Sequence, residues 1–78
     1  MRCTSHFDAI RKRRDRTLIR DAWIERAIRT PLRKETQADG RLRCWIAIPE
    51  MGNRYLPVVL LADGETVHNA FFDRNSKP

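Results

Sequence analysis

The hydrophobic pattern of this chain changes its period at Thr30-Pro31, and this change limits the folds open to it. Before this point, apolar residues recur at helical spacing and form a wide stripe from Leu18 to Ile28. The helix is expected to stop at Thr30, because the residue before a proline avoids the helical region. After this point, apolar and polar residues alternate from Arg41 to Ile48, which is typical of a strand with one buried face. The chain therefore has a helical first half and a β second half.

Capping and turn residues place the boundaries of the elements. Ser5 is a candidate cap for the first helix, because its hydroxyl can accept a hydrogen bond from an unpaired backbone N–H. Asp39-Gly40 and Asp63-Gly64 predict hairpin turns, since the central residues of such turns must tolerate positive φ. We expect helices at about 6–14 and 18–29, strands at about 33–37, 41–48, 54–62 and 66–73, and a flexible tail at 75–78.

The order of these elements predicts a single α+β domain that spans residues 1–78. We expect two N-terminal helices packed on one face of a three- to four-stranded antiparallel β-meander, with the other face open to water. Trp23 is expected to anchor the core. Pro57 conflicts with a central strand, because proline cannot donate to a ladder, so we expect either a bulge or an unpaired side at this residue.

The charge of the chain is +6 and is unevenly distributed. Residues 1–43 hold 13 Lys or Arg against 6 Asp or Glu, and residues 44–78 hold 3 against 4, which gives +7 and −1. A basic front half favours polyanions, although a solvated helical face explains the same charges. No apolar run approaches the roughly 20 residues of a membrane span, and no signal peptide is visible, so a cytoplasmic protein with reduced Cys3 and Cys44 is expected.

The residues that could carry chemistry are arginines and one histidine of the β half. Cleavage of RNA by its own 2′-hydroxyl needs a base, an acid, and cations that hold the phosphate. His68 suits proton transfer because its ordinary pKa lies near neutrality, and Arg43 suits phosphate because its planar fork binds two oxygens. His68 and Arg43 are therefore the candidate catalytic residues. The candidate nucleic-acid-binding residues are Arg41, Arg43, Trp45, Arg54 and Arg74, with Trp45 able to stack on an unpaired base.

Each of these residues also has a purely structural explanation. Arg41 and Arg43 fit ordinary charges on a wet sheet face, and His68 fits a partly buried histidine bonded to a neighbour. Asp73-Arg74 fits an ion pair that closes the last strand, and Trp45 fits a cover for the outer sheet face or a dimer contact. The sequence contains no His/Cys cluster with zinc spacing and no glycine-rich phosphate loop, so we expect neither a metal nor a cofactor.

From about Ser5 to Arg74 the chain resembles a family of small bacterial and phage proteins catalogued as domain of unknown function 4258. The resemblance rests on a helix ending in RTP, on Asp-Gly-Arg-x-Arg-x-Trp at 39–45, on Ile-Pro-Glu at 48–50 and on Phe-Phe-Asp-Arg at 71–74. That family is distantly similar to the RelE/ParE/BrnT toxin superfamily, which includes ribosome-dependent and free ribonucleases. The resemblance implies a RelE/BrnT-like fold and an antitoxin-like partner protein. Pro57 stands where relatives are expected to carry a basic residue, which removes one candidate phosphate contact.

These observations lead to three hypotheses. The first is a RelE/BrnT-like, toxin-type protein that binds RNA or the ribosome and cleaves RNA. The second is a non-enzymatic module that binds nucleic acid or an acidic protein. The third is self-association as a homodimer, through an edge strand or exposed aromatic residues.

Overall fold

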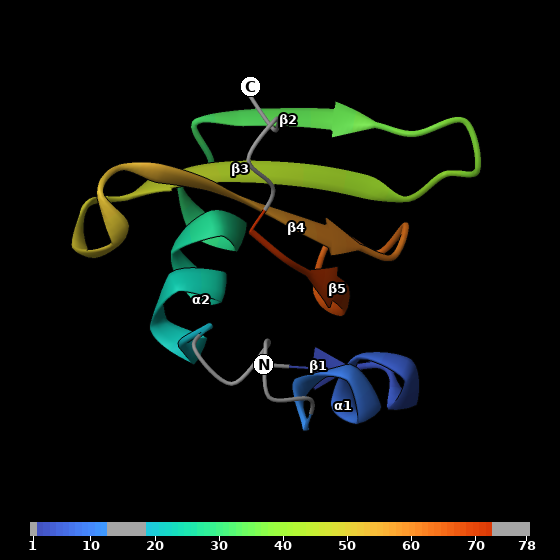
Figure 1. Cartoon of the computed structure of the whole chain (residues 1–78). Helices are drawn as coiled ribbons and strands as arrows, with labels where there is room; N and C mark the ends of the chain where they lie inside the picture. The colour runs from blue at the N-terminus through green and yellow to red at the C-terminus, as the bar shows by residue number, and fades with distance from the viewer. Residues whose placement is uncertain (1, 13–18, 73–78) are drawn as a thin grey trace.

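The computed structural model describes residues 2–12 and 19–72, which form an α+β domain around a mixed sheet (Figure 1). The described part holds two α-helices, α1 (Ser5–Arg11) and α2 (Asp21–Arg29), and a 3₁₀ turn, η2 (Pro49–Met51). Neither helix is long and apolar enough to cross a bilayer. The strands are β1 (Arg2–Cys3), β2 (Arg33–Thr36), β3 (Leu42–Ile48), β4 (Arg54–Leu60) and β5 (Thr66–Ala70).

The sheet is not the purely antiparallel meander that the sequence predicts. Strands β2 to β5 pair antiparallel in sequence order, and β1 adds a parallel fifth strand on β5, which gives the order β1-β5-β4-β3-β2. In β1, Arg2 pairs with Thr66 and Cys3 with Val67. The sequence gives no sign of β1, because two residues are too few to show an alternation.

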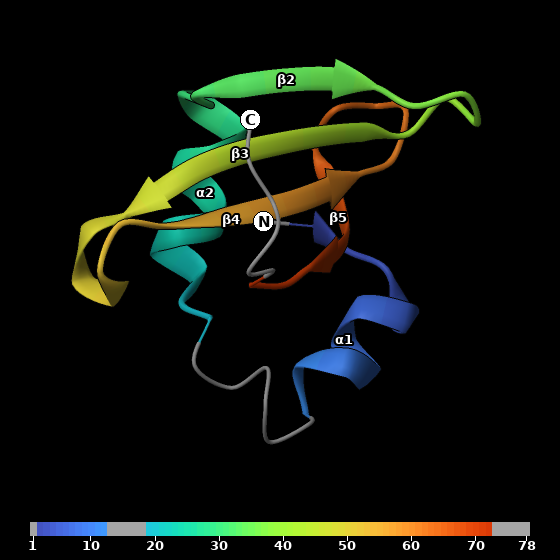
Figure 2. The same cartoon turned by 45° about the horizontal axis from the view of Figure 1, so that its top comes forward.

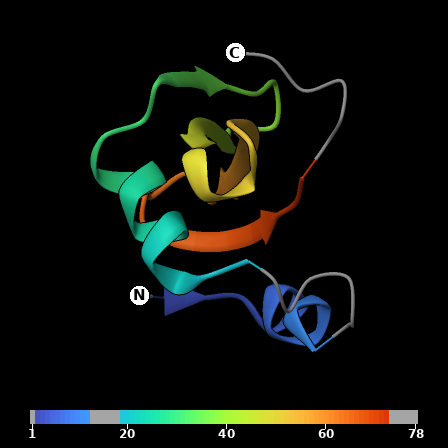
Figure 3. The ribbon, with the colours of Figure 1, turned by 60° about the vertical axis from the view of Figure 1, so that its left-hand side comes forward.

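The two helices occupy different places along this sheet. Helix α2 packs against β3, whereas α1 contacts β5 beside the β1 edge (Figure 1 and Figure 3). Phe7 of α1 and the buried Trp23, Ile24 and Ala27 of α2 nevertheless belong to one apolar core, so the expected role of Trp23 is confirmed. The expectation of two helices layered over a meander is therefore too simple, since α1 lies at the end of the sheet where β1 joins it.

The helix boundaries differ from the expected ones by a few residues. The cap of α1 is Thr4 and not Ser5: the Thr4 hydroxyl accepts from the Phe7 N–H at 3.1 Å, because Thr4 keeps the extended backbone of β1. Helix α2 begins at Asp21, later than expected, and ends at Arg29. Thr30 then leaves the helical region at the predicted place before Pro31. The expected end of the first helix, residue 14, lies outside the described residues.

Side chains of the sheet alternate between the core and an outer face, as predicted for the strand after Gly40. The even-numbered Cys44, Ile46 and Ile48 of β3 join the helices in the core. The core is completed from the other strands by Leu56, Val58, Leu60, Val67 and Ala70. The outer face carries the odd-numbered residues of β3 and β4, among them the candidate residues Arg43 and Trp45.

Two aspartates close the hairpins in which they were expected. Asp39 accepts from the Arg41 N–H at 3.0 Å, and Gly40 takes a positive φ of 90° that a residue without a Cβ adopts at low cost. Asp63 accepts from the Glu65 and Thr66 N–H groups, both at 2.9 Å, and from the Thr66 hydroxyl at 2.6 Å. These hydrogen bonds, that of the Thr66 hydroxyl first, lower the pKa of Asp63 to about 2.

Pro57 fits within β4 because its nitrogen, which carries no hydrogen, faces the side of β5, and the β4–β5 pairing has ended at this residue. The Trp45 carbonyl bonds to the Leu32 N–H on the β2 side, so the Trp45–Pro57 pair carries no hydrogen bonds between β3 and β4. The polar atoms of Pro57 therefore face β5, which ends at Ala70, and its carbonyl accepts from the Phe71 N–H at 3.3 Å. Of the two expected explanations, an unpaired side of the strand is correct.

Candidate functional site

The outer face of the sheet gathers several of the predicted site residues in two neighbouring rows. In one row, Arg43 of β3 lies beside Val59 of β4, and Val59 pairs with Asn69 of β5. In the next row, Trp45 lies between Arg33 of β2 and Pro57 of β4. The predicted alternation of β3 is thus correct, and Arg41, Arg43 and Trp45 share this face.

Trp45 does not offer an open ring for a base to stack on. Only 5% of its surface is exposed. The guanidinium carbons of Arg33 and Arg43 each lie 5.8 Å from the centre of its ring, a distance at which a cation is attracted to the π face. The expectation that Trp45 stacks on RNA is therefore not supported by its burial, and its physical role is to hold two guanidinium groups in place.

Arg43 differs from the other arginines of this face in having no acidic partner within the described residues. Glu35, its cross-strand neighbour, instead forms an ion pair with Arg33 at 3.7 Å, and Arg41 forms an ion pair with Asp39 at 3.6 Å. The Nε atom of Arg43 is buried without a hydrogen-bond partner. The side chain is thus half-buried, packed against an indole, and left with its charge uncompensated by any described carboxylate.

His68 lies on the same face because β5 is irregular at this point. Leu60 pairs with Val67 but Val59 pairs with Asn69, so His68 is an extra residue in β5 and the pairing shifts register. Its Nδ1 atom lies 3.2 Å from the Thr4 hydroxyl oxygen, and its ring stacks on His6 with centroids 4.7 Å apart. The Thr4 hydroxyl oxygen already accepts from Phe7, which leaves its hydrogen available to donate to an unprotonated Nδ1.

The surroundings of His68 favour its neutral form. Partial burial lowers its pKa first, the positive charge of Arg41 second and His6 third, while Asp39 opposes them. Two strand spacings of about 4.8 Å separate the β3 and β5 backbones, so Arg43 and His68 sit roughly 10 Å apart across the face.

Two predicted residues do not join this group. Arg54 is exposed at the start of β4, where it pairs with the core residue Ile48. It therefore lies at the end of β4 far from Arg41, since Leu42, the neighbour of Arg41, pairs with Leu60 at the other end of the strand. Its register also places it on the helix side of the sheet. Arg74, with Asp73, lies outside the residues that the structure describes.

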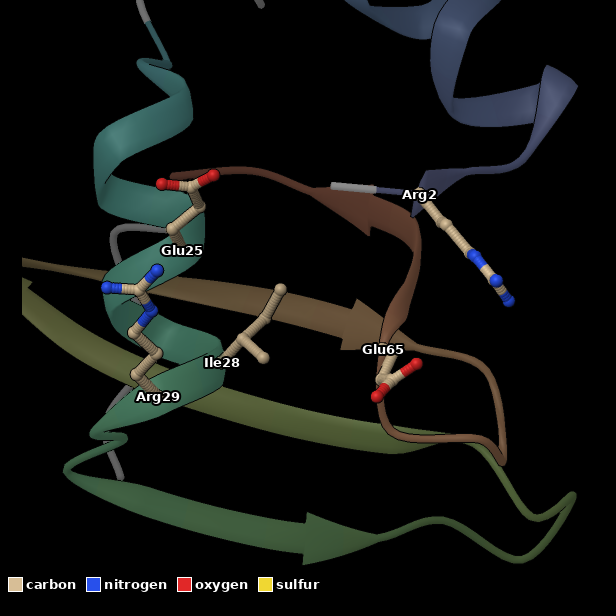
Figure 4. A pocket seen from close by; sticks show the side chains of 5 residues that line it. All are labelled: Arg2, Glu25, Ile28, Arg29 and Glu65. Carbon is tan, nitrogen blue, oxygen red and sulfur yellow. The ribbon is translucent and has the colours of Figure 1, made fainter.

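A hollow on the other side of the molecule is a weaker candidate. It measures about 260 Å³ and lies between α2 and the β1 side of the sheet (Figure 4). Figure 4 shows Glu25, Ile28 and Arg29 on α2, with Arg2 and Glu65 across from them. Its volume falls below the usual 300–1,000 Å³ of small-molecule sites, and four of its five lining residues are charged. We therefore place the candidate site on the outer face.

Three residues near the candidate site were not predicted from the sequence: Thr4 and His6, which contact His68, and Arg33, which lies beside Trp45. Arg33 could have been found, since a three-residue loop at 38–40 brings it opposite Trp45, whereas a two-residue turn at Asp39-Gly40 would bring Lys34 there instead. Thr4 and His6 could not, because their position depends on β1. Among residues 2–12 and 19–72, no three His, Cys, Asp or Glu side chains cluster in a way that could hold a metal. Searches of protein-family models, curated proteins and solved structures found no match to this chain.

Proposed function

We propose that this chain is a small RNA-binding protein of the RelE/BrnT toxin type, which holds the RNA backbone on its outer sheet face. The observation that carries the proposal is the state of Arg43. Its guanidinium group is packed against Trp45 at 5.8 Å, its Nε atom is buried without a partner, and no described carboxylate neutralises it. A half-buried cation in this state gains from an anion that pairs with it from outside.

A phosphodiester is the anion that suits this arginine. The planar fork of arginine binds two phosphate oxygens at once, and stacking on an aromatic ring fixes the plane of the fork beforehand. Arg41 and Arg33 add positive charge on the same face, although each bonds to a carboxylate. Since Trp45 is buried, the proposal is one of backbone binding without base stacking, and sequence-tolerant recognition is expected.

RNA cleavage is the second part of the proposal, and the histidine pair supports it. His68 and His6 stack at 4.7 Å, so two groups able to carry a proton lie together on the side of the face toward β1. The lowered pKa of His68 keeps it neutral near pH 7, which suits a general base that removes the 2′-hydroxyl proton. Arg43 and Arg41 would hold the phosphate as negative charge builds on its oxygens.

Binding and cleavage are tested separately with a labelled single-stranded RNA about 20 nucleotides long. Arg43→Gln is expected to weaken binding at least tenfold, a loss of about 1.4 kcal/mol. Arg54→Gln removes the same charge from the far end of the sheet and should change binding little. Equal binding by the wild type and Arg43→Gln would refute the role of Arg43.

Cleavage is measured on a denaturing gel with the same RNA and with its DNA counterpart, which lacks the 2′-hydroxyl. The proposal expects cut RNA and intact DNA, with the activity lost in both His68→Gln and His6→Gln. Uncut RNA that is still bound would reject the catalytic part and retain the binding part. The family resemblance also leads us to propose an antitoxin-like partner protein. Its test is whether co-expression of a candidate partner relieves a growth arrest caused by expression of this chain.

A non-enzymatic binding module is the second candidate, and one observation favours it. Arg33 and Arg41 each lie within 4 Å of a carboxylate, at 3.7 and 3.6 Å, which lowers the net charge that this face offers to a polyanion. Such a face also suits an acidic protein segment that competes for the same arginines. Salt-sensitive RNA binding without any product on the gel would select this candidate.

A further inference from the structure

Strand β2 leaves one edge of the sheet open. It is the last strand in the sheet order, and no strand formed by residues 2–12 and 19–72 pairs with its outer side (Figure 1 and Figure 2). All four of its residues are exposed, and Leu32 just before it has 61% of its surface exposed. An open edge of this kind presents unpaired N–H and C=O groups that can pair with another strand.

The pairing of β2 with β3 fixes which backbone groups face outward. The Gln37 N–H bonds to the Arg41 carbonyl, and Arg33 pairs with Trp45 in the same register. Because hydrogen-bonding direction alternates along a strand, Arg33 and Glu35 direct their backbone groups to β3. Lys34 and Thr36 direct theirs to solvent, so a further antiparallel strand must bond to these two residues.

We propose that β2 pairs with β2 of a second copy of this chain, in an antiparallel register with the two-fold axis at Lys34. In this register the Lys34 backbone groups of the two copies bond to each other, and each Leu32 lies opposite Thr36 of the second copy. Arg33 of each copy lies opposite Glu35 of the other, on the outer face that both residues share. This is the closely spaced, non-hydrogen-bonded type of pair, in which opposite charges attract most strongly.

Charge selects this register over its neighbours. An axis at Glu35 places two glutamates opposite each other, and an axis at Arg33 places two arginines opposite each other, both of which are unfavourable. An axis at Thr36 overlaps fewer strand residues and forms no opposite-charge pair within β2. Lys34 is a residue type that discourages indiscriminate edge pairing, and on the axis its long side chain can turn away from its copy toward water.

The axis is perpendicular to the sheet, so the two outer faces would lie side by side on one surface. The association requires only β2 and Leu32, and it is independent of whether Arg43 binds RNA. A strand of four residues is too short to bury the roughly 1,200 Å² of stable interfaces, so we expect dimerisation at about 100 μM protein rather than at nanomolar concentrations.

The test is sedimentation equilibrium of the full chain over a concentration series. The mass is expected to rise from 9.2 kDa toward twice this value as concentration increases. Arg33→Glu and Glu35→Arg each place like charges opposite each other twice, and each should raise the dissociation constant at least about tenfold. The double charge swap restores opposite charges both across the axis and within β2, and should return the dissociation constant to the wild-type value.

Two controls carry the same charge changes away from the edge: Arg54→Glu for the first variant and Glu25→Arg for the second. Both should dimerise like the wild type, and circular dichroism checks that each variant is folded. A wild type that stays at 9.2 kDa up to about 1 mM overturns the proposal. Single variants that dimerise like the wild type, or a double swap that fails to restore dimerisation, overturn it as well.

Discussion

Removing the carboxylate of Glu50 should destabilise the fold through the loss of one partly buried hydrogen bond. Glu50 lies in η2, and its Oε2 atom accepts from the indole N–H of Trp23 at 2.8 Å. Trp23 is 5% exposed and forms part of the core. Glu50→Ala would leave this N–H without the partner that the loop between β3 and β4 supplies.

The magnitude follows from the kind of bond and the size of the chain. A hydrogen bond to a charged group contributes about 1.5–3 kcal/mol, and the exposure of Glu50 favours the lower half, about 1.5–2 kcal/mol. A chain of 78 residues has a free energy of unfolding of about 4–12 kcal/mol. The loss should lower Tm by about 6–16 °C, since a domain of this size shifts by roughly 4–8 °C per kcal/mol.

Urea unfolding followed by circular dichroism measures this loss. Glu50→Gln keeps an acceptor and should cost about half as much as Glu50→Ala, while Glu25→Ala, an exposed acid on α2, should stay within about 0.5 kcal/mol of the wild type. A double-mutant cycle with Trp23→Phe isolates the pair, and its coupling energy should exceed about 1 kcal/mol. A coupling near zero, or an unchanged Glu50→Ala midpoint, would refute the reasoning.

Two further predictions follow from shifted pKa values. The pKa of His68 in the folded chain lies below the ordinary 6.5, so the unfolded chain binds the proton more readily. The free energy of unfolding should therefore fall as the pH drops below about 6.5 and should level off below the folded pKa. In urea unfolding between about pH 7.5 and 5, His68→Gln should lose less stability than the wild type, and equal losses would contradict this. Burial raises the pKa of the Cys44 thiol, although the positive charge of Lys34 opposes this shift, and Cys44 is only 1% exposed. An alkylating reagent should therefore label the half-buried Cys3 before Cys44. Mass spectrometry of the native protein that shows Cys44 labelled as fast as Cys3 would be the contrary result.

Much of the sheet could be predicted from alternation, and the limits of that prediction are physical. Alternation assigns Cys44 and Ile46 to the core and Arg43 to the outer face, because one face of the strand must be buried. It does not reveal what covers the opposite face, so the 5% exposure of Trp45 could not be predicted. Applied to β4, the same alternation separates Arg54 from the outer face, because Arg54 has the same parity as the core residues Leu56 and Val58.

The histidine pair could not be predicted, because it depends on contacts distant in sequence. His6 reaches His68 through β1, a two-residue parallel strand with no periodic pattern, and through the Thr4 cap that follows it. The extra residue in β5 that turns His68 to the outer face also leaves no sign in the sequence. Local patterns therefore determine the meander, whereas the N-terminal edge of the sheet is set by tertiary packing.

The salt dependence of RNA binding tests the role of Arg43 most directly. For single-stranded RNA, each phosphate contact contributes about −0.7 to the slope of log binding constant against log salt concentration. Contacts from the three arginines of the outer face therefore predict a slope near −2. Fluorescence anisotropy should show that Arg43→Gln weakens binding and reduces this slope by about 0.7, while Arg54→Gln leaves both unchanged. A slope that is the same in the wild type and Arg43→Gln would show that no phosphate contacts this arginine, and the outer face would then not be the RNA-binding surface.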